Sequence, residues 1–379
     1  MRPRLLALSL VLAFGAVALA QDARVVRTDE VAVRVETFAR GLENPWGMAF
    51  LPDGRLLVTE RPGRLRIVAR DGSLSAPVTG LPALAVRGQG GLLDVALAHD
   101  FATTGLVYLC HAAAGDPDSS TALSVGRLVE SPGGGRLENL RMLFRQRPQT
   151  SRGQHYGCRI VFAPDGNLFL TLGDHFTQRD QAQNLGNTIG KIVRLTPDGQ
   201  VPHDNPFVNR NGFDPAIWSY GHRNVQGATM GPDGALWVSE HGARGGDEIN
   251  RVERGRNYGW PVITYSLDYS GAVISPHTAR EGMEQPVHHW STNDTIAPSG
   301  AAFVASDLFP AWRGNLLVGG LRSQLLMRLV IENGRVTHEE RMLRELGERI
   351  RDVRQGPDGA IWLLTDNPRG RVLRLTPAR

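Results

Sequence analysis

A histidine and an aspartate bracket one strand-like segment of this sequence. The stretch QTSRGQHYGCRIVFAPDGNLFLTLGDHF, residues 149–176, places His155 before a run of apolar residues and Asp174 after it. A Pro-Asp-Gly turn in the middle folds such a run into a hairpin, which brings its two ends together. An aspartate bonded to one ring nitrogen fixes the tautomer of the histidine and leaves the other nitrogen free as a general base. The alternative is a structural histidine that caps a turn, with Asp174 as an ordinary turn residue.

Other polar residues stand just before strand-like segments elsewhere in the chain. These residues are Gln89 in RGQGGLLDV, Arg223 and Asn224 in GHRNVQG, and Arg349 and Arg351 in ERIRDV. Each of them taken alone fits an ordinary loop residue better than a binding residue. If their strands start around one axis, however, an amide, an imidazole and several guanidinium groups converge. Because guanidinium forks match carboxylates bidentately, this set predicts a site for a multiply anionic ligand.

A glycine-rich acidic segment suggests a metal site. In SEHGARGGDEINRVERGRNYGWP, residues 239–261, Gly242, Gly245 and Gly246 allow the backbone to turn so that carbonyl groups face one centre. Asp247 and Glu248 add hard oxygen donors of the kind that calcium prefers. The alternative is a polar, glycine-rich loop that binds no metal.

The elements that position these residues follow from an internal repeat. A strand, a Pro-Asp-Gly turn and a second strand recur at 49–60, 161–174, 229–240 and 354–366, with weaker copies at 95–111 and 302–320. Six copies spaced by roughly 45 to 75 residues, most followed by further short strands, predict an all-β fold, a six-bladed β-propeller. Segment 30–39 alternates like a strand, and we expect it to close the ring by pairing with the last blade, which ends at GRVLRLTP. A β-sandwich with a second domain is the rival architecture.

Composition restricts the class of protein. Residues 1–20 begin with two arginines, continue as an apolar run and end in Ala-Leu-Ala, so we expect a removed signal peptide followed by the propeller domain at 21–379. An uncleaved anchor is the alternative. The expected mature protein is periplasmic or secreted, without stable membrane insertion. The formal net charge of +4 with no basic run gives no support for nucleic acid binding. Cys110 and Cys158 form either one disulfide or two buried thiols; their spacing does not decide which.

Several motifs in order resemble one family. The segments GQGGLLDVAL, HYGCRIVFAPDGNLFLTLGD, GHRNVQGATMGPDG, EHGARGGDEIN, NYGWP and RIRDV are similar to those of the soluble quinoprotein sugar dehydrogenases. The chain looks closest to the aldose sugar dehydrogenase branch, and the resemblance covers nearly all of residues 35–378. It implies two cofactors, pyrroloquinoline quinone (PQQ) and calcium. It also implies an aldose substrate oxidised to a lactone by hydride transfer to the quinone, and an external electron acceptor.

The resemblance further implies a role for each candidate residue. His155 is the general base toward the C1 hydroxyl of the sugar, Asp174 orients it, and Arg223 polarises the quinone. The residues implied to hold the quinone are Gln89, Arg223, Asn224, Arg322, Arg349 and Arg351. The implied calcium ligands are the carbonyls of Gly242 and Ala243 for a calcium that bridges to the quinone, and Glu248 and the Tyr258 backbone for a second, structural calcium.

Two positions depart from the family pattern. Arg322 stands where the glucose enzymes of the family carry a lysine, which keeps the charge but changes the geometry of the contact. Ala243 replaces a proline that is common in relatives, and a carbonyl ligand survives that change.

Two other functions fit a propeller. A calcium-dependent lactonase or hydrolase would centre its metal on side-chain carboxylates and would need no arginine cluster. A non-enzymatic binding propeller would need neither His155 nor Asp174. The sequence names neither the preferred sugar nor the physiological acceptor nor the oligomeric state, and the loops at 175–190 and 262–296 are the expected determinants of sugar preference.

Overall fold

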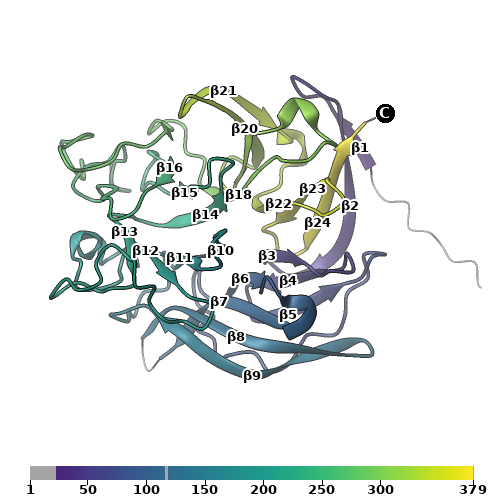
Figure 1. Cartoon of the computed structure of the whole chain (residues 1–379). Coiled ribbons are helices and arrows are strands. Elements are labelled where there is room, and N and C mark those ends of the chain that lie inside the picture. The colour runs from purple at the N-terminus through teal and green to yellow at the C-terminus, as the bar shows by residue number, and fades with distance from the viewer. Residues whose placement is uncertain (1–22, 116–117, 379) are drawn as a thin grey trace, which may run out of the picture.

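The computed structural model describes residues 23–115 and 118–378. The expected signal peptide at 1–20 lies outside the described residues. Six antiparallel sheets follow one another along the chain and form the six blades of a β-propeller, as the repeat predicts (Figure 1). No helix in the described part is long and apolar enough to span a bilayer.

Each blade is a short antiparallel sheet. Blade 1 contains β3 (Pro45–Phe50), β4 (Leu56–Glu60) and β5 (Arg64–Val68). Blade 2 contains β6 (Leu92–Leu97), β7 (Leu106–Ala114), β8 (Ser119–Ser131) and β9 (Gly134–Arg145). Blade 3 contains β10 (Gly157–Phe162), β11 (Leu168–Leu172), β12 (Lys191–Leu195) and β13 (Ile217–Tyr220). Blade 4 contains β14 (Val225–Met230), β15 (Leu236–Glu240), β16 (Glu248–Val252) and β17 (His288–His289). Blade 5 contains β18 (Pro298–Phe303), β19 (Leu316–Gly320), β20 (Leu325–Glu332) and β21 (Arg335–Met342). Blade 6 contains β22 (Ile350–Gln355), β23 (Ile361–Thr365), β24 (Gly370–Pro377), β2 (Val33–Leu42) and β1 (Ala23–Val26).

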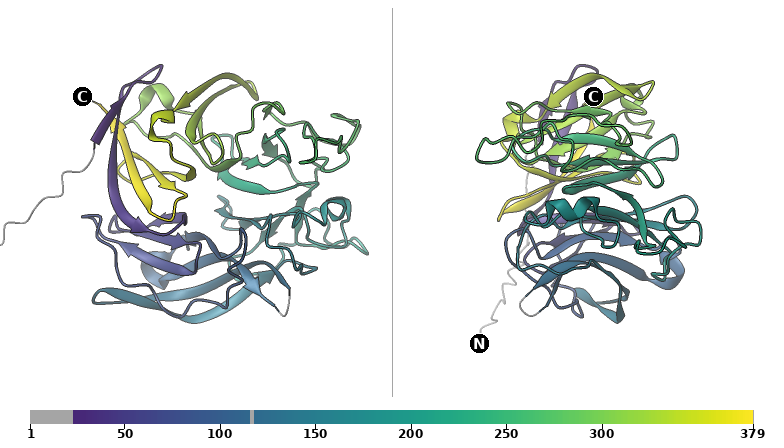
Figure 2. Two further views of the ribbon diagram at one scale, coloured as in Figure 1. Left: turned by 180° about the vertical axis from the view of Figure 1, so that it is seen from behind. Right: turned by 90° about the vertical axis from the view of Figure 1, so that its left-hand side faces the viewer.

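Blade 6 closes the ring with strands from both ends of the chain. Strand β2 pairs with β24 in antiparallel register, from Val33 opposite Pro377 to Leu42 opposite Gly370. This pairing confirms the expectation for segment 30–39. Figure 2 shows the N-terminal strand, in purple, beside the C-terminal strand, in yellow. Ring closure of this kind removes the free edge that an open array of blades would expose.

Helical structure in the described ranges is confined to short segments between strands. They are α1 (Phe101–Thr104) and the 3₁₀ turns η1 (Arg179–Gln183), η2 (Pro310–Trp312) and η3 (Arg344–Leu346). Strands β16 and β17 lie within the long segment 243–296, where the sequence pattern predicted no strand. Strand β16 has five residues and β17 has two, which is too short for a clear alternating pattern in the sequence.

The Pro-Asp-Gly turns form as their residues dictate. The glycines of the four turns, Gly54, Gly166, Gly234 and Gly359, have φ between +74° and +87°, a region open to glycine. The preceding aspartate of each turn accepts the backbone N–H two residues later, at 2.9–3.2 Å. The first strand of each blade therefore returns outward as the second, and both ends of the hairpin lie on the same face of the ring.

The core is divided among the blade interfaces. Six clusters of buried apolar side chains combine residues of adjacent blades, five of them from two blades and one from blades 1, 2 and 3. The first strands β3, β6, β10, β14, β18 and β22 contact one another around the axis (Figure 1). A blade cannot bury both its faces alone, so burial of apolar area between blades stabilises the ring. The residues that precede the first strands are thereby held around a common centre.

Candidate active site

His155 and Asp174 meet at the mouth of blade 3. The ring Nδ1 of His155 lies 2.7 Å from Oδ1 of Asp174, which confirms that the two ends of this hairpin come together. Asp174 also accepts the Phe176 N–H on Oδ1 at 2.8 Å and the indole N–H of Trp260 on Oδ2 at 2.9 Å. Burial raises the pKa of Asp174, but the bonds from His155 and Phe176 and the charge of Arg223 hold that pKa below its usual range. Three donors thus hold an ionised carboxylate against the imidazole.

The imidazole of His155 is prepared to accept a proton. Burial, followed by the neighbouring charge of Arg223, lowers the pKa of His155, and the bond to Asp174 opposes this only in part. The ring is therefore neutral at neutral pH. Nδ1–H of His155 donates to Asp174, and no residue of the described chain hydrogen-bonds to Nε2. Phe176 packs edge-on against the ring, with 5.4 Å between ring centroids.

The backbone that carries the histidine is attached to blade 2. The His155 N–H donates to Oε1 of Gln89 at 2.8 Å, and the Tyr156 carbonyl accepts the hydroxyl of Thr121 at 2.6 Å. Cys158 forms a disulfide with Cys110 of β7, with 5.6 Å between the Cα atoms. The structure thus decides the pairing that the sequence left open. Hydrogen bonds and one covalent bond between blades fix the segment that begins at His155.

A hollow of about 570 Å³ lies beside this pair, at the axis of the ring. Gln89, Asn224, Arg349 and Arg351, all four expected at an anion site, line it together with the indole of Trp46. Its volume is in the range of small-molecule and cofactor sites. The structure therefore brings these four side chains together, as the sequence predicted.

The two arginines of the hollow are held by one carboxylate. Arg349 and Arg351 donate to Oδ2 of Asp366 at 3.0 and 2.8 Å, and Arg351 also donates to Oε1 of Gln226 at 2.8 Å. One carboxylate balances only one of the two guanidinium charges. In addition, Nε of Arg351 is buried with no hydrogen-bond partner among the described residues. A positive excess and an unused buried donor fit an anionic ligand such as a carboxylate.

Arg223 links the histidine to the glycine-rich loop. It donates to the carbonyls of Gly242 at 2.6 Å and His241 at 3.2 Å, and to the Tyr269 hydroxyl at 3.1 Å. Its guanidinium carbon lies 5.3 Å from the ring centroid of Trp260, the residue that bonds to Asp174. Arg223 therefore brings a positive charge between the imidazole and the expected metal carbonyls.

The glycine-rich loop offers carbonyl groups in place of carboxylates. Both oxygens of Asp247 accept backbone N–H groups, from Gly242 at 2.9 Å and from Ile296 and Ala297 at 2.8 and 2.9 Å. Asp247 thus shapes the loop, while the Gly242 carbonyl faces Arg223. No cluster of three or more His, Cys, Asp or Glu suited to a metal occurs among residues 23–115 and 118–378. A calcium here would depend on backbone oxygens, as the resemblance implies for Gly242 and Ala243.

Glu248 belongs to a second acidic location, at the start of β16. It lies directly opposite Glu240 in the strand register, and burial, followed by the charge of Glu240, raises its pKa to about 8. Oε2 of Glu240 lies 2.9 Å from Nδ1 of His222, within hydrogen-bond distance. The ring of Tyr258 stacks on the same imidazole, with 4.8 Å between ring centroids. Two adjacent carboxylates, Glu240 buried and Glu248 half-buried, with one imidazole partner suit a bound cation. The structure thus brings Glu248 and Tyr258 into one neighbourhood, joined by Glu240 and His222.

Arg322 lines a hollow that adjoins the hollow of Arg349 and Arg351. It is exposed and lines a separate hollow of about 870 Å³ together with Gly242 and Ala243. The hollow that contains Arg349 and Arg351 does not include it. His241 and Ala297 form part of the wall of both hollows, so the two adjoin.

Sequence reasoning missed three residues that orient this site. Trp260, Asp366 and Glu240 each bond to a candidate residue or to its backbone. The repeat contained a signal for the two acids, because Asp174, Glu240 and Asp366 occupy the same place, at or just after the end of the second strand of a blade. From that place each acid bonds to a residue that precedes the first strand of its own blade or lies at its start. Trp260 stands in the NYGWP motif, but its contact with Asp174 spans blades and has no local signal.

Comparison with known proteins places this geometry among sugar dehydrogenases. Residues 42–374 match the family model described as glucose/sorbosone dehydrogenase. The aldose sugar dehydrogenase YliI of Escherichia coli strain K12 is 45% identical over 91% of this chain and 93% of its own length. The apo-form crystal structure of the soluble E. coli aldose sugar dehydrogenase superposes with a TM-score of 0.87 at 44% identity, over 91% of this chain and 100% of that chain. The PQQ-bound aldose sugar dehydrogenase of Streptomyces coelicolor superposes with a TM-score of 0.75 at 30% identity, over 94% of this chain and 100% of that one.

Proposed function

Because this chain belongs to the glucose/sorbosone dehydrogenase family, we propose that it is a PQQ-dependent aldose sugar dehydrogenase. The proposed reaction oxidises the C1 hydroxyl of an aldose to the lactone, and the electrons pass to an external acceptor that is neither NAD nor oxygen. The observation that carries the proposal is a neutral, oriented imidazole next to an arginine-lined hollow at the axis of the ring.

The residues of the hollow fit a tricarboxylate quinone. Gln89, Asn224, Arg349 and Arg351 would hold it, and the free Nε donor and excess charge of the arginine pair support this assignment. Arg223 and Arg322 would contact it from the glycine-rich side. When bound, the quinone supplies a carbonyl carbon that accepts hydride.

The protein residues supply proton transfer and orientation. His155 takes the proton of the sugar hydroxyl on Nε2 while hydride leaves C1. Asp174 stabilises the imidazolium that results and keeps the ring in the productive tautomer. Phe176 and Trp260 cover the pair and limit access of water. General base catalysis of this kind contributes about 10²–10⁴ in rate.

Calcium is part of the same proposal. The Gly242 and Ala243 carbonyls would hold one ion next to Arg223, and Glu248 with the Tyr258 backbone would hold a second, structural ion. The carbonyl-rich loop and the paired carboxylates Glu240 and Glu248 support this assignment. A periplasmic or secreted location is also proposed, and the disulfide between Cys110 and Cys158 supports it because such bonds persist in oxidising compartments.

The experiment separates the base from the cofactor site. Apoprotein is mixed with PQQ and calcium, quinone retention is measured after gel filtration, and aldose oxidation is followed with an artificial acceptor over a panel of sugars. His155→Ala should retain the quinone and lose at least about 10²-fold in turnover. The matched control is His338→Ala, because His338 is an exposed histidine of β21, and this variant should behave as wild type. Turnover at the wild-type level in His155→Ala would refute the assignment of the base.

A further inference from the structure

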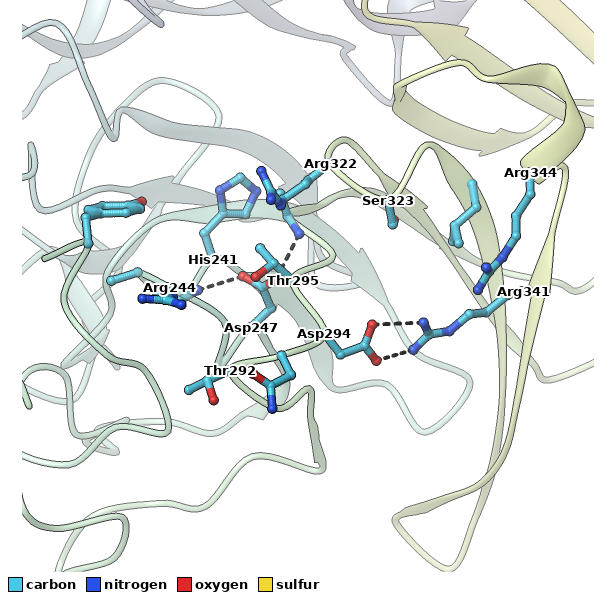
Figure 3. Close-up of a pocket in the computed structure, with 16 residues that line it drawn as sticks. His241, Arg244, Asp247, Thr292, Asp294, Thr295, Arg322, Ser323, Arg341 and Arg344 are labelled. Atoms are coloured by element: carbon cyan, nitrogen blue, oxygen red, sulfur yellow. Dashed lines mark hydrogen bonds and ion pairs between the residues drawn. The ribbon is translucent and has the colours of Figure 1, made fainter. Parts of the chain in front are cut away.

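The larger hollow at the mouth of the ring has more arginines than the quinone assignment uses. It measures about 870 Å³ and lies between blades 4 and 5, bounded by segments 241–247, 292–297, 322–325 and 341–344. Figure 3 shows Arg341 and Arg344 on one side of it, Arg244 on the other and Arg322 at its upper edge. The family resemblance assigns no role to Arg244 or Arg344.

Most of the arginines in this hollow have no counter-charge. The lining contains four arginines and two aspartates. The carboxylate of Asp247 accepts three backbone N–H groups, and both oxygens of Asp294 accept hydrogen bonds from Arg341. Arg244, Arg322 and Arg344 are exposed, and their guanidinium groups form no ion pair with any described residue. Because Arg322 is assigned to the quinone, Arg244 and Arg344 remain, and two unpaired guanidinium groups at one concavity favour a further ligand with negative charge.

The position of the hollow indicates what such a ligand does. It shares His241 and Ala297 with the proposed quinone hollow, so a ligand here lies next to the cofactor. The residues that contact His155, namely Gln89, Asp174 and Phe176, do not line it. A ligand in this hollow is therefore close to the redox group and away from the base that receives the sugar proton.

We propose that this hollow binds a small anionic electron acceptor that reoxidises the enzyme. The inference rests on the proposed dehydrogenase function. Sugar oxidation leaves two electrons and two protons on the enzyme; a one-electron anionic acceptor removes them in two encounters, and the protons pass to solvent. The concave shape and volume suit a small molecule better than a flat protein surface. Arg244 and Arg344 attract it, and this attraction weakens as salt screens the charges.

The kinetic test compares acceptors of different charge. The holoenzyme oxidises a saturating neutral aldose with hexacyanoferrate(III), an anion, or with an uncharged benzoquinone. Arg244→Gln and Arg344→Gln should each lower kcat/KM for hexacyanoferrate(III) by about two- to five-fold at low salt, the range for one exposed charge pair, and leave the benzoquinone value unchanged. Arg335→Gln is the control, since Arg335 is an exposed arginine of the same blade outside the hollow. Equal losses with both acceptors, or no loss with either, would overturn the proposal.

Two further arms separate this proposal from its alternatives. If Arg344→Gln raises KM for glucuronate but not for glucose, with benzoquinone as acceptor, the hollow binds an acidic sugar and the acceptor assignment is wrong. Binding of hexacyanocobaltate(III), a redox-inert anion of the same charge, can be measured by calorimetry without turnover. If the Arg344→Gln variant binds this anion more weakly than the Arg335→Gln variant does, the hollow is an anion site. If, in addition, the protein oxidises no sugar, the proposed dehydrogenase function is wrong although the anion site stands. Identical binding to both variants would remove the site itself.

Discussion

Replacing Asp174 by asparagine should inactivate the base without disturbing the quinone site. The carboxylate accepts three N–H groups, from His155 and Phe176 on Oδ1 and from Trp260 on Oδ2. An asparagine amide offers one oxygen and one NH₂ group, so one donor must face another donor in either orientation. If the oxygen faces His155, the NH₂ opposes the Trp260 indole. If the oxygen faces Trp260, the NH₂ opposes the Phe176 N–H and donates to Nδ1 of His155, which protonates Nε2 and removes the base.

The magnitude follows from these contacts. A buried donor without an acceptor costs about 1–3 kcal/mol, so the two orientations are close in free energy and a substantial fraction of molecules hold the inactive tautomer. Loss of the negative charge also destabilises the imidazolium formed during reaction, because Asp174 supports the pKa of His155. We expect turnover to fall by about 10²–10⁴, with quinone retention unchanged.

Trp260→Phe provides a sharp second variant. In the double variant with Asp174→Asn, the NH₂ group no longer meets the indole N–H, so the orientation that keeps His155 in its active tautomer is favoured. Where the two orientations of the single variant are about equally populated, removing a cost of about 1–3 kcal/mol places nearly all molecules in the active tautomer, a recovery of about two-fold. Stopped-flow reduction of the bound quinone measures the chemical step. A double variant no faster than Asp174→Asn, or an Asp174→Asn rate equal to wild type, would refute the reasoning.

Three other outcomes test the site. The turnover rate should fall as pH drops through the pKa of His155, and the midpoint of this fall should lie below the pKa of a free imidazole. Arg223→Gln should raise the midpoint, because, besides burial, the charge of Arg223 lowers the pKa of His155. An unshifted or lower midpoint in the pH profile of the variant would contradict this cause. Replacing Cys110 and Cys158 by serine should lower turnover while quinone retention persists, because the segment that carries the base loses its covalent link to blade 2; equal turnover in a dye-linked assay would show that the hydrogen bonds suffice. Calcium should raise the melting temperature of the wild-type apoprotein, and Glu248→Gln should reduce that increase; the same increase in both, measured by scanning calorimetry, would move the second ion elsewhere.

Local contacts made much of this protein predictable. The Pro-Asp-Gly repeat predicts six blades, because each turn and its flanking strands form from neighbouring residues. The contact between His155 and Asp174 was predictable for the same reason, since both ends of one hairpin must meet. The convergence of Arg349, Arg351 and Asn224 followed from the ring alone, because first strands of different blades start around one axis.

Contacts between blades had no signal of this kind. Trp260 bonds to Asp174 from 86 residues away, and Arg351 reaches Gln226 from 125 residues away. The link between Cys110 and Cys158, and the placement of Arg322 and Arg349 in two adjoining hollows, likewise depend on how far neighbouring blades rotate and which side chains fill the space between them. Residue order along the chain sets the fold of each blade, whereas the closed ring sets the distances between blades. Those distances decide which carboxylate, indole or guanidinium surrounds each residue of the candidate site.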